Sequence, residues 1–298
     1  MVAEGLSFCP RPYLSQGGKL SADRGDNPSP ANAGYVHGHS PVESQRLRDQ
    51  ATTLAQLLHH DSFFRPPGLV LEAGCGTGEQ TAILADQNPE CTFVSIDIAG
   101  ESLAMAEKAL RSRGIQNVRF QPADVFNLPF ARESFDHIFV CFLLEHIRAP
   151  MTALKALRKV LKPGGTITVI EGDHGSAYYH PRSEAAQATI QCLIDVQAAL
   201  GGNSLIGREL YPLLVFAGFQ GCSVSPRVVY ADASRPEMVD GFTRKTFIAM
   251  VEGVREQAVT RGLISRDEWT KGIADLYRTA GPEGTFSYTF FKAVARKP

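Results

Sequence analysis

The residues Val70-Leu71-Glu72-Ala73-Gly74-Cys75-Gly76-Thr77-Gly78 say more about the architecture of this chain than any other segment. The apolar run ends at the acid Glu72. Three glycines then occupy every second position, and residues 79–81 are expected to begin a helix. Glycine allows positive φ and lets a ligand approach the backbone closely. The N-terminus of the following helix offers free N–H groups to a carboxylate. The pattern therefore predicts the first strand, loop and helix of an open α/β sheet that binds a ligand.

The spacing of the glycines separates two kinds of nucleotide site. A dinucleotide fingerprint needs glycine at its first, third and sixth positions, and the sixth position here is Glu79. This difference argues against a nicotinamide-dependent dehydrogenase. The loop instead resembles the nucleoside-binding loop of class I S-adenosylmethionine (SAM) methyltransferases. That resemblance implies SAM as the cofactor and S-adenosylhomocysteine as its product.

Composition narrows the classes of function. The 298 residues carry 30 Lys+Arg against 31 Asp+Glu, a formal net charge of −1, so no nucleic-acid partner is expected. Six cysteines form no CxxC pair, which indicates a reducing cytoplasm and no metal site. The longest apolar run, residues 138–144, is too short to cross a bilayer, and no signal-peptide pattern opens the chain. We therefore expect a soluble cytoplasmic protein that does not engage membranes.

Before the glycine loop, two segments differ in composition. Residues 1–33 are rich in Gly, Pro, Ser and Ala and are expected to form a flexible leader. Residues 34–62 are expected to form a helical cover, because Ser40-Pro41-Val42-Glu43 has the pattern of a capping box with proline at the first helical position. This helix is expected to end near His60, with His59 and His60 both at the surface.

From residue 63 to 298 the chain alternates strand and helix before its pattern changes. This alternation predicts a doubly wound, mostly parallel seven-stranded sheet of the Rossmann-like kind, with helices on both faces. A helical insert at 236–281, read as two helices, separates the last two strands and is expected to roof the active site. The expected strands are 69–72, 92–96, 117–121, 136–142, 166–170, 222–230 and 285–295; the expected helices outside the insert are 79–87, one around 103–110, 151–161, 183–200 and 207–217.

Acids recur where the predicted strands end. In open α/β sheets, ligands bind at the carboxyl ends of the strands, near the switch point of the topology. Asp97 follows the second strand, where its carboxylate suits both ribose hydroxyls, and Asp124 follows the third strand, where it suits the adenine amino group. The segment from Cys141 is expected to flank the methionine part. The predicted cofactor-binding residues are Tyr35, Glu72, Gly74, Gly76, Gly78, Gln80, Asp97, Ile98, Ala123, Asp124, Val125 and Cys141.

Residues 69–173 resemble the large methyltransferase family of the ubiquinone-biosynthesis and "methyltransferase domain 11" kind. The resemblance implies the fold and the cofactor, whereas acceptors in this family range from quinones to sterols to alkaloids. The segments that carry it are Glu72-Ala73-Gly74-Cys75-Gly76-Thr77-Gly78, Asp97, Asp124 with Asn127-Leu128-Pro129-Phe130, Phe135-Asp136, Leu144-Glu145-His146 and Leu161-Lys162-Pro163-Gly164-Gly165.

The flanking segments resemble bacterial natural-product methyltransferases that alkylate an indole carbon of tryptophan-derived metabolites. They are Tyr35-Val36-His37-Gly38-His39-Ser40, Arg46-Leu47 with Gln50, and residues 284–293. Their relatives often carry tyrosine where this chain has His39. This narrower resemblance implies a small aromatic acceptor, with C3 of an indole ring as the first choice.

Carbon alkylation of an indole is helped by a base near the ring N–H, worth about 10²–10⁴-fold. His37 is the leading candidate because imidazole titrates near neutrality. Tyr35 is expected to orient it or to close over SAM, and His39 lies in the same cluster. The alternative is that Tyr35 packs and both histidines cap the turn.

A second group follows the fifth predicted strand. Glu171 is a candidate to bond a substrate N–H or amine, the alternative being that it solvates the strand end. His174, Tyr178, Tyr179 and His180 are the predicted substrate-pocket residues. Phe242, Phe247, Met250 and Trp269 in the insert are read as core.

Two further functions stay open. An O- or N-methyltransferase acting on a small aromatic or isoprenoid acceptor would share every SAM-binding residue named above. A non-catalytic SAM-binding regulatory module would bind SAM without producing a methylated product. A nucleobase methyltransferase is disfavoured, because residues 141–144 lack the Asp/Asn-Pro-Pro-aromatic run that would clamp a base. A homodimer is possible.

Overall fold

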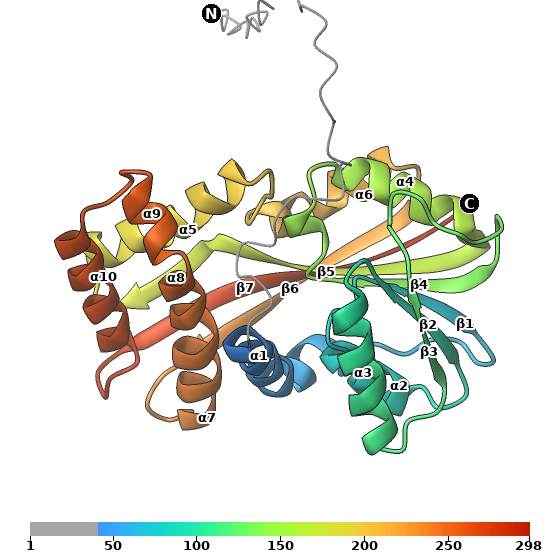
Figure 1. The fold of residues 1–298 in the computed structure, drawn as a ribbon, viewed down its shortest axis with the longest axis horizontal. Coiled ribbons are helices and arrows are strands. Elements are labelled where there is room, and N and C mark those ends of the chain that lie inside the picture. Colours follow the sequence, from blue (N-terminus) through green and yellow to red (C-terminus); the bar gives the residue numbers. More distant parts are fainter. Residues whose placement is uncertain (1–40) are drawn as a thin grey trace, which may run out of the picture.

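The computed structural model describes residues 41–298, so the segment 1–33 and Tyr35, His37 and His39 lie outside the described residues. One seven-stranded sheet runs through the described chain in the order β3-β2-β1-β4-β5-β7-β6 (Figure 1). Strands β1 to β5 pair in parallel, and β7 is antiparallel to both of its neighbours. This confirms the predicted fold class. The strands are β1 (Leu69–Ala73), β2 (Thr92–Asp97), β3 (Val118–Pro122), β4 (Phe135–Cys141), β5 (Leu161–His180), β6 (Gln220–Ala231) and β7 (Thr285–Arg296).

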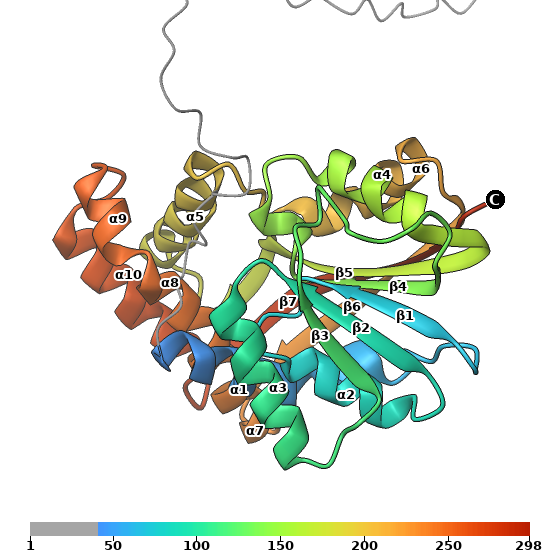
Figure 2. The same ribbon diagram turned by 45° about the vertical axis from the view of Figure 1, so that its right-hand side comes forward.

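Helices cover both faces of this sheet, as Figure 2 shows. On one face lie α1 (Pro41–His59), α2 (Glu79–Gln87) and α3 (Gly100–Ser112); on the other lie α4 (Pro150–Val160) and α6 (Leu210–Phe216), with the short 3₁₀ helices η1 (Leu144–His146) and η2 (Ile206–Glu209) nearby. Two apolar clusters result, one on each side of the central strands. Both faces of β1 and β4 are therefore buried, which accounts for their continuous apolar runs.

The helical insert between β6 and β7 packs against α1 and against α5 (Glu184–Ala199). It consists of α7 (Pro236–Met238), the π-helix η3 (Val239–Ile248), α8 (Ala249–Gly253), α9 (Arg255–Thr260) and α10 (Arg266–Thr279), rather than two helices. The π-helix crosses α1 at Gly241, where a Cβ would lie 2.2 Å from Thr53 Oγ1. A capping box formed by Ser265 and Glu268 begins α10.

Strand β5 is longer than the predicted 166–170, because it continues to His180. Its second half pairs with β7 from Glu171 opposite Phe291 to His180 opposite Thr285, with a register shift between Asp173 and Tyr178. The partner strand lies more than a hundred residues away in the chain, so local sequence does not announce this extension. The long β5–β7–β6 ribbon joins the insert, at the left of Figure 1, to the part of the sheet covered by α2 and α3.

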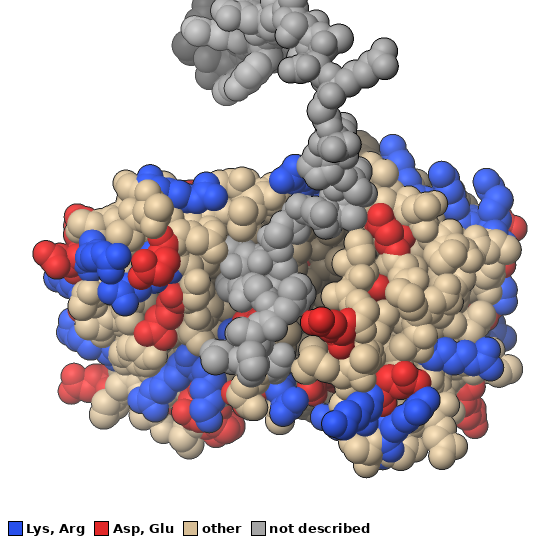
Figure 3. Space-filling model, in the orientation of Figure 1, with Lys and Arg blue, Asp and Glu red and all other residues tan. Residues whose placement is uncertain are grey.

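Two further features of the described chain are the distribution of its surface charges and the hydropathy of its helices. Figure 3 shows basic and acidic side chains intermixed over the insert and over α2 and α3, with basic side chains gathered along α4. Within residues 41–298, no helix is both long enough and apolar enough to cross a membrane.

Candidate cofactor and acceptor site

The glycine loop lies at the carboxyl end of β1 and is tied to the end of β2. Gly74, Gly76 and Gly78 all have positive φ. Gly76 N–H donates to Asp97 Oδ2 at 2.8 Å, while Ala99 N–H donates to Asp97 Oδ1 at 2.9 Å. A Cβ at Gly76 would meet no heavy atom of the described chain within 4 Å, so the outer side of this backbone is open. The loop is thus a bare backbone cradle beside an ionisable carboxylate.

Predicted nucleoside contacts gather along the same edge of the sheet. Ile98 is 58% exposed, which is high for an aliphatic side chain and provides an apolar surface on which a flat base can lie. Ala123 N–H donates to Asp97 O at 3.1 Å, which joins the segment after β3 to the end of β2. Asp124 Oδ1 accepts from Phe126 N–H at 2.9 Å, and Val125 is buried beneath it. Cradle, carboxylates and apolar surface fit a nucleoside.

Glu72 lies beneath the loop rather than in the open. It is 2% exposed, and its Oε2 accepts from Thr81 Oγ1 at 2.7 Å and from Ser95 Oγ at 2.6 Å. Burial raises the pKa of Glu72 to about 7, although both hydroxyl groups oppose the shift. Its carboxyl group therefore joins β1, β2 and α2 and shapes the loop. Direct contact between Glu72 and a cofactor stays a prediction.

A buried glutamate organises the chain after β4. Glu171, with 0% exposure, accepts from the N–H groups of Leu143 (3.1 Å) and Leu144 (2.7 Å) through Oε1. Its Oε2 has no hydrogen-bond partner among the described residues. Burial, reinforced by the nearby carboxyl group of Glu145, raises the pKa of Glu171 well above its usual range. Cys141, also buried, precedes this turn at the end of β4.

Helix α1 brings a guanidinium group to these carboxyl groups. Arg46 is 7% exposed and binds Glu43 through two bonds, Nε to Oε2 at 2.7 Å and a terminal nitrogen to Oε1 at 2.6 Å. Burial raises the pKa of Glu145 to about 7, and the positive charge of Arg46 opposes that shift. Burial lowers the pKa of the adjacent His146 to about 3. Arg46 and Glu145 appeared in the sequence only as parts of motifs, with no role attached.

The four predicted pocket residues on β5 separate into two groups. His174 is buried with this cluster: its Nδ1 lies 2.8 Å from Tyr288 Oη, and burial lowers the pKa of its imidazole to about 4. Tyr178 is 74% exposed, and Tyr179 stacks on Phe286 at 6.3 Å. His180 pairs with Thr285 at the far end of the strand. The structure therefore gathers Glu171 and His174 but not the other three.

The sequence did not indicate the buried polar groups of Tyr288 and Lys292, and the predicted surface position of His59 is wrong. Tyr288 belongs to an alternating aromatic strand, whose pattern shows which positions are buried but not that one of them meets a histidine. Lys292 on the same strand is 3% exposed and reaches the end of α1. His59 is 0% exposed, so its predicted surface position is wrong, whereas His60 is exposed as expected. The prediction that Phe247 of the insert belongs to the core is confirmed, because its side chain is fully buried.

Comparison with known proteins agrees with this geometry. A family model described as "Methyltransferase domain" matches residues 68–218. An uncharacterized 37.1 kDa protein of a Streptomyces fradiae transposon is 31% identical over 77% of this chain and 61% of its own length. Demethylmenaquinone methyltransferase of Geobacillus stearothermophilus is 33% identical over 34% of this chain and 44% of its own. The chain thus spans less than two thirds of the curated relatives it matches.

Solved structures extend the likeness to the fold. A putative methyltransferase from Bacillus halodurans has a TM-score of 0.52 and 17% identity, covering 83% of this chain and 99% of its own. Phosphoethanolamine N-methyltransferase 2 from Haemonchus contortus, in complex with S-adenosyl-L-methionine, has a TM-score of 0.52 and 16% identity, covering 83% of this chain and 52% of its own. At these identities the likeness concerns the fold alone.

Proposed function

This chain belongs to the methyltransferase domain family, and from that premise we propose that it is a SAM-dependent methyltransferase acting on a small aromatic acceptor, with C3 of an indole ring as the methylated atom. The observation that carries the cofactor assignment is the bond from Gly76 N–H to Asp97 Oδ2. It brings a backbone without a Cβ and a carboxylate to one rim of the sheet. The further lone pairs of that carboxylate suit two ribose hydroxyls.

SAM, when bound, supplies an electrophilic methyl group on a sulfonium. The residues of the chain then have to hold the acceptor in line, with its nucleophilic atom about 3–3.5 Å from that methyl group. They also have to exclude water and remove a proton. The buried cluster of Glu145, Glu171 and His174 suits this task because it lies beside the turn that follows β4.

Proton removal from an indole N–H favours a group that titrates near neutral pH. Burial raises the pKa of Glu145 to about 7, which brings the titration of its carboxyl group close to neutral pH. Glu145 is therefore the candidate base, and Glu171, which accepts from Leu143 and Leu144 through Oε1, holds the turn beside it. The alternative base is His37, with Tyr35 and His39 beside it in the sequence; these residues lie outside the described chain.

The cofactor assignment is tested by calorimetry with S-adenosylhomocysteine. Asp97→Ala removes the acceptor for two hydroxyl groups, and one hydrogen bond to a charged group is worth about 1.5–3 kcal/mol. Affinity should therefore fall at least tenfold, whereas Asp195→Ala, at a surface acid on α5, should change nothing. Unaltered binding to Asp97→Ala, or no binding to the wild type, would end the proposal.

The acceptor is tested with SAM and a panel of indoles, phenols and amines, followed by location of the new methyl group by mass spectrometry and NMR. Methyl on C3 of an indole supports the proposal. An N- or O-methyl product overturns carbon alkylation and leaves the cofactor assignment intact. Binding of SAM without any methylated product identifies a regulatory module instead.

The base is tested with isosteric variants. Glu145→Gln keeps the size of the side chain but loses its ionisable carboxyl group, so turnover should fall by about 100-fold or more with SAM affinity retained. Glu237→Gln, at an exposed glutamate of the insert, is the matched control. Undiminished turnover in Glu145→Gln together with loss in His37→Ala would transfer the role to His37.

A further inference from the structure

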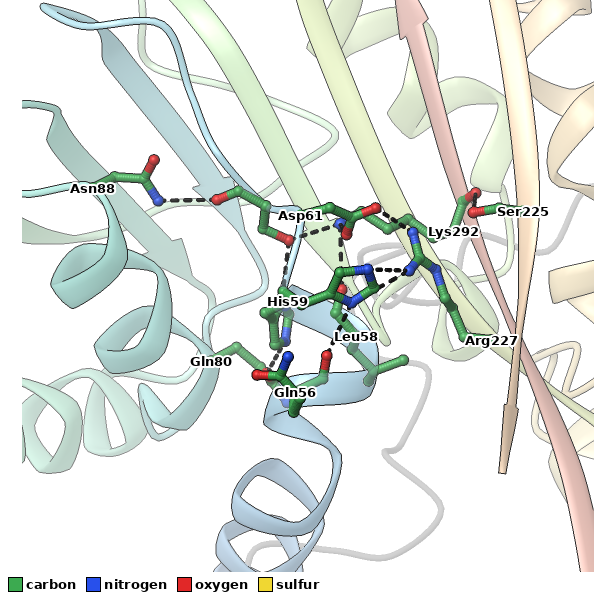
Figure 4. A network of polar contacts seen from close by, with 11 residues as sticks. Gln56, Leu58, His59, Asp61, Gln80, Asn88, Ser225, Arg227 and Lys292 are labelled. Atoms are coloured by element: carbon green, nitrogen blue, oxygen red, sulfur yellow. Dashed lines mark hydrogen bonds and ion pairs between the residues drawn. The ribbon is translucent and has the colours of Figure 1, made fainter. Parts of the chain in front are cut away.

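A buried polar network at the end of α1 has no part in the chemistry proposed above. Its centre is His59, which is 0% exposed, and it extends to Gln80 on α2 and to Lys292 on β7 (Figure 4). His60, the next residue, is exposed and contacts Arg227 instead. The network thus connects the helix that covers the site, the last strand of the sheet and the first turn after the glycine loop.

The donors and acceptors of this network can be assigned one after another, starting from Lys292. The ammonium group of Lys292 donates to Ser62 Oγ at 2.8 Å, to Asp61 Oδ1 at 2.6 Å and to Leu58 O at 3.2 Å. Ser62 Oγ lies 3.4 Å from His59 Nδ1 and keeps its own hydrogen while it accepts from the lysine, so it can donate to an Nδ1 without hydrogen. In the tautomer with the ring hydrogen on Nε2, His59 Nδ1 accepts this bond.

His59 Nε2 lies 2.5 Å from Gln80 Oε1, and Figure 4 shows the two side chains directed toward one another. Burial lowers the pKa of His59 to about 4, so its ring is neutral near pH 7 and carries one hydrogen. A carbonyl oxygen only accepts, so with Gln80 Oε1 toward His59 that hydrogen lies on Nε2. The NH₂ group of Gln80 therefore faces away from His59, two residues beyond Gly78.

We propose that His59 is a positioning residue for the cofactor: it holds the oxygen of Gln80 so that the Gln80 NH₂ group donates to the carboxylate of the cofactor's amino-acid end. This inference rests on the SAM site proposed above. An amide NH₂ group only donates, and the amino-acid end of SAM carries one acceptor-only group, its carboxylate. Asp97 and Asp124, which only accept when ionised, suit the hydroxyl and amino groups of the nucleoside.

The experiment compares two ligands that differ in the amino-acid end. S-adenosylhomocysteine carries the carboxylate, whereas 5′-methylthioadenosine keeps the nucleoside and thioether but lacks the whole amino-acid part. Binding of both is measured by calorimetry at pH 7.5 to the wild type, Gln80→Met, Gln80→Glu, His59→Ala and the matched control His60→Ala. Gln80 is only half-buried, so its variants keep the test valid if His59→Ala does not fold.

Gln80→Met should weaken S-adenosylhomocysteine about 10- to 100-fold, the value of one hydrogen bond to a charged group, and leave 5′-methylthioadenosine within about twofold. Gln80→Glu should weaken S-adenosylhomocysteine further, because like charges then meet. His59→Ala should show the same selective loss, with no added loss in the double variant His59→Ala/Gln80→Met. His60→Ala should match the wild type.

Equal weakening of both ligands, or unchanged affinity for S-adenosylhomocysteine in the Gln80 variants, would overturn the positioning role while leaving the SAM site intact. Binding of neither ligand to the wild type would instead overturn the proposed function. A loss that merely follows lower stability would appear with both ligands, which separates a structural role of His59 from positioning.

Discussion

The glycine loop offers a matched pair of substitutions whose costs differ for a reason visible in the structure. Gly76 and Gly78 both have positive φ, 52° and 80°. A Cβ at Gly76 would meet nothing within 4 Å among the described residues, whereas a Cβ at Gly78 would lie 2.8 Å from Ala106 Cβ on α3. Alanine should therefore cost backbone strain at Gly76, and both strain and overlap at Gly78.

Left-handed backbone costs an L-residue about 1–2 kcal/mol, and overpacking adds about 1–3 kcal/mol. Gly76→Ala should thus lower the free energy of unfolding by about 1–2 kcal/mol, and Gly78→Ala by about 2–5 kcal/mol. Ala106→Gly alone should cost about 1 kcal/mol as a helix-interior glycine. In the Gly78→Ala/Ala106→Gly double variant the closest overlap, with Ala106 Cβ, is removed, while Ala106 Cα and Leu110 Cδ1 stay at 3.2 Å, so the cycle should show a favourable coupling of about 1–3 kcal/mol.

Urea denaturation of the four proteins and of Gly76→Ala provides the free energies, with unchanged m-values required for the comparison. Calorimetry adds the second half of the reasoning, because the Cβ of Gly76→Ala projects into the open side of the cradle. Affinity for S-adenosylhomocysteine should fall more in Gly76→Ala than in Gly78→Ala, the reverse of the order in stability. Equal destabilisation of both variants, or zero coupling with Ala106→Gly, would refute the packing argument.

Two further predictions concern the buried interior. The folded-state pKa of Glu72 is raised to about 7 from an ordinary value of 4.5, so its protonated form contributes stability that is complete below about pH 4.5 and is lost as the pH rises through 7. Urea denaturation at pH 5 and pH 8 should show the wild type losing stability relative to Glu72→Gln at the higher pH, and a difference independent of pH would contradict the burial of this carboxyl group. Phe247→Ala should lower the free energy of unfolding by about 3–5 kcal/mol, because Phe247 is fully buried with its ring 4.7 Å from that of Phe286; Tyr178→Ala, at an exposed aromatic, should stay within about 0.5 kcal/mol of the wild type.

Short-range sequence patterns were sufficient to predict the parallel strands and the edge of the sheet where the cofactor is expected to bind. The alternating glycines after β1 indicate a strand, a tight loop and a helix. The acid at the end of β2 lies one helix and one strand further along the chain. In a parallel sheet all these carboxyl ends meet at one edge, so Asp97 and the loop come together without further information. The seven strands and their mostly parallel arrangement were likewise predicted from the alternation of strand and helix together with the likeness of residues 69–173 to a known family.

The acceptor side depended on contacts between distant parts of the chain. Nothing local separates His59 from His60, yet one is enclosed by α2 and β7 while the other faces solvent, because only one side of α1 meets the sheet. Tyr178 and His174 belong to the same strand, but the register with β7 directs one outward and buries the other beside Tyr288. Sequence alone determined the strands and helices around the glycine loop and where their ends meet, since turns and periodicity are local properties. Tertiary structure alone decided which polar side chains are enclosed together, because burial and pairing are properties of segments that meet only in the folded chain.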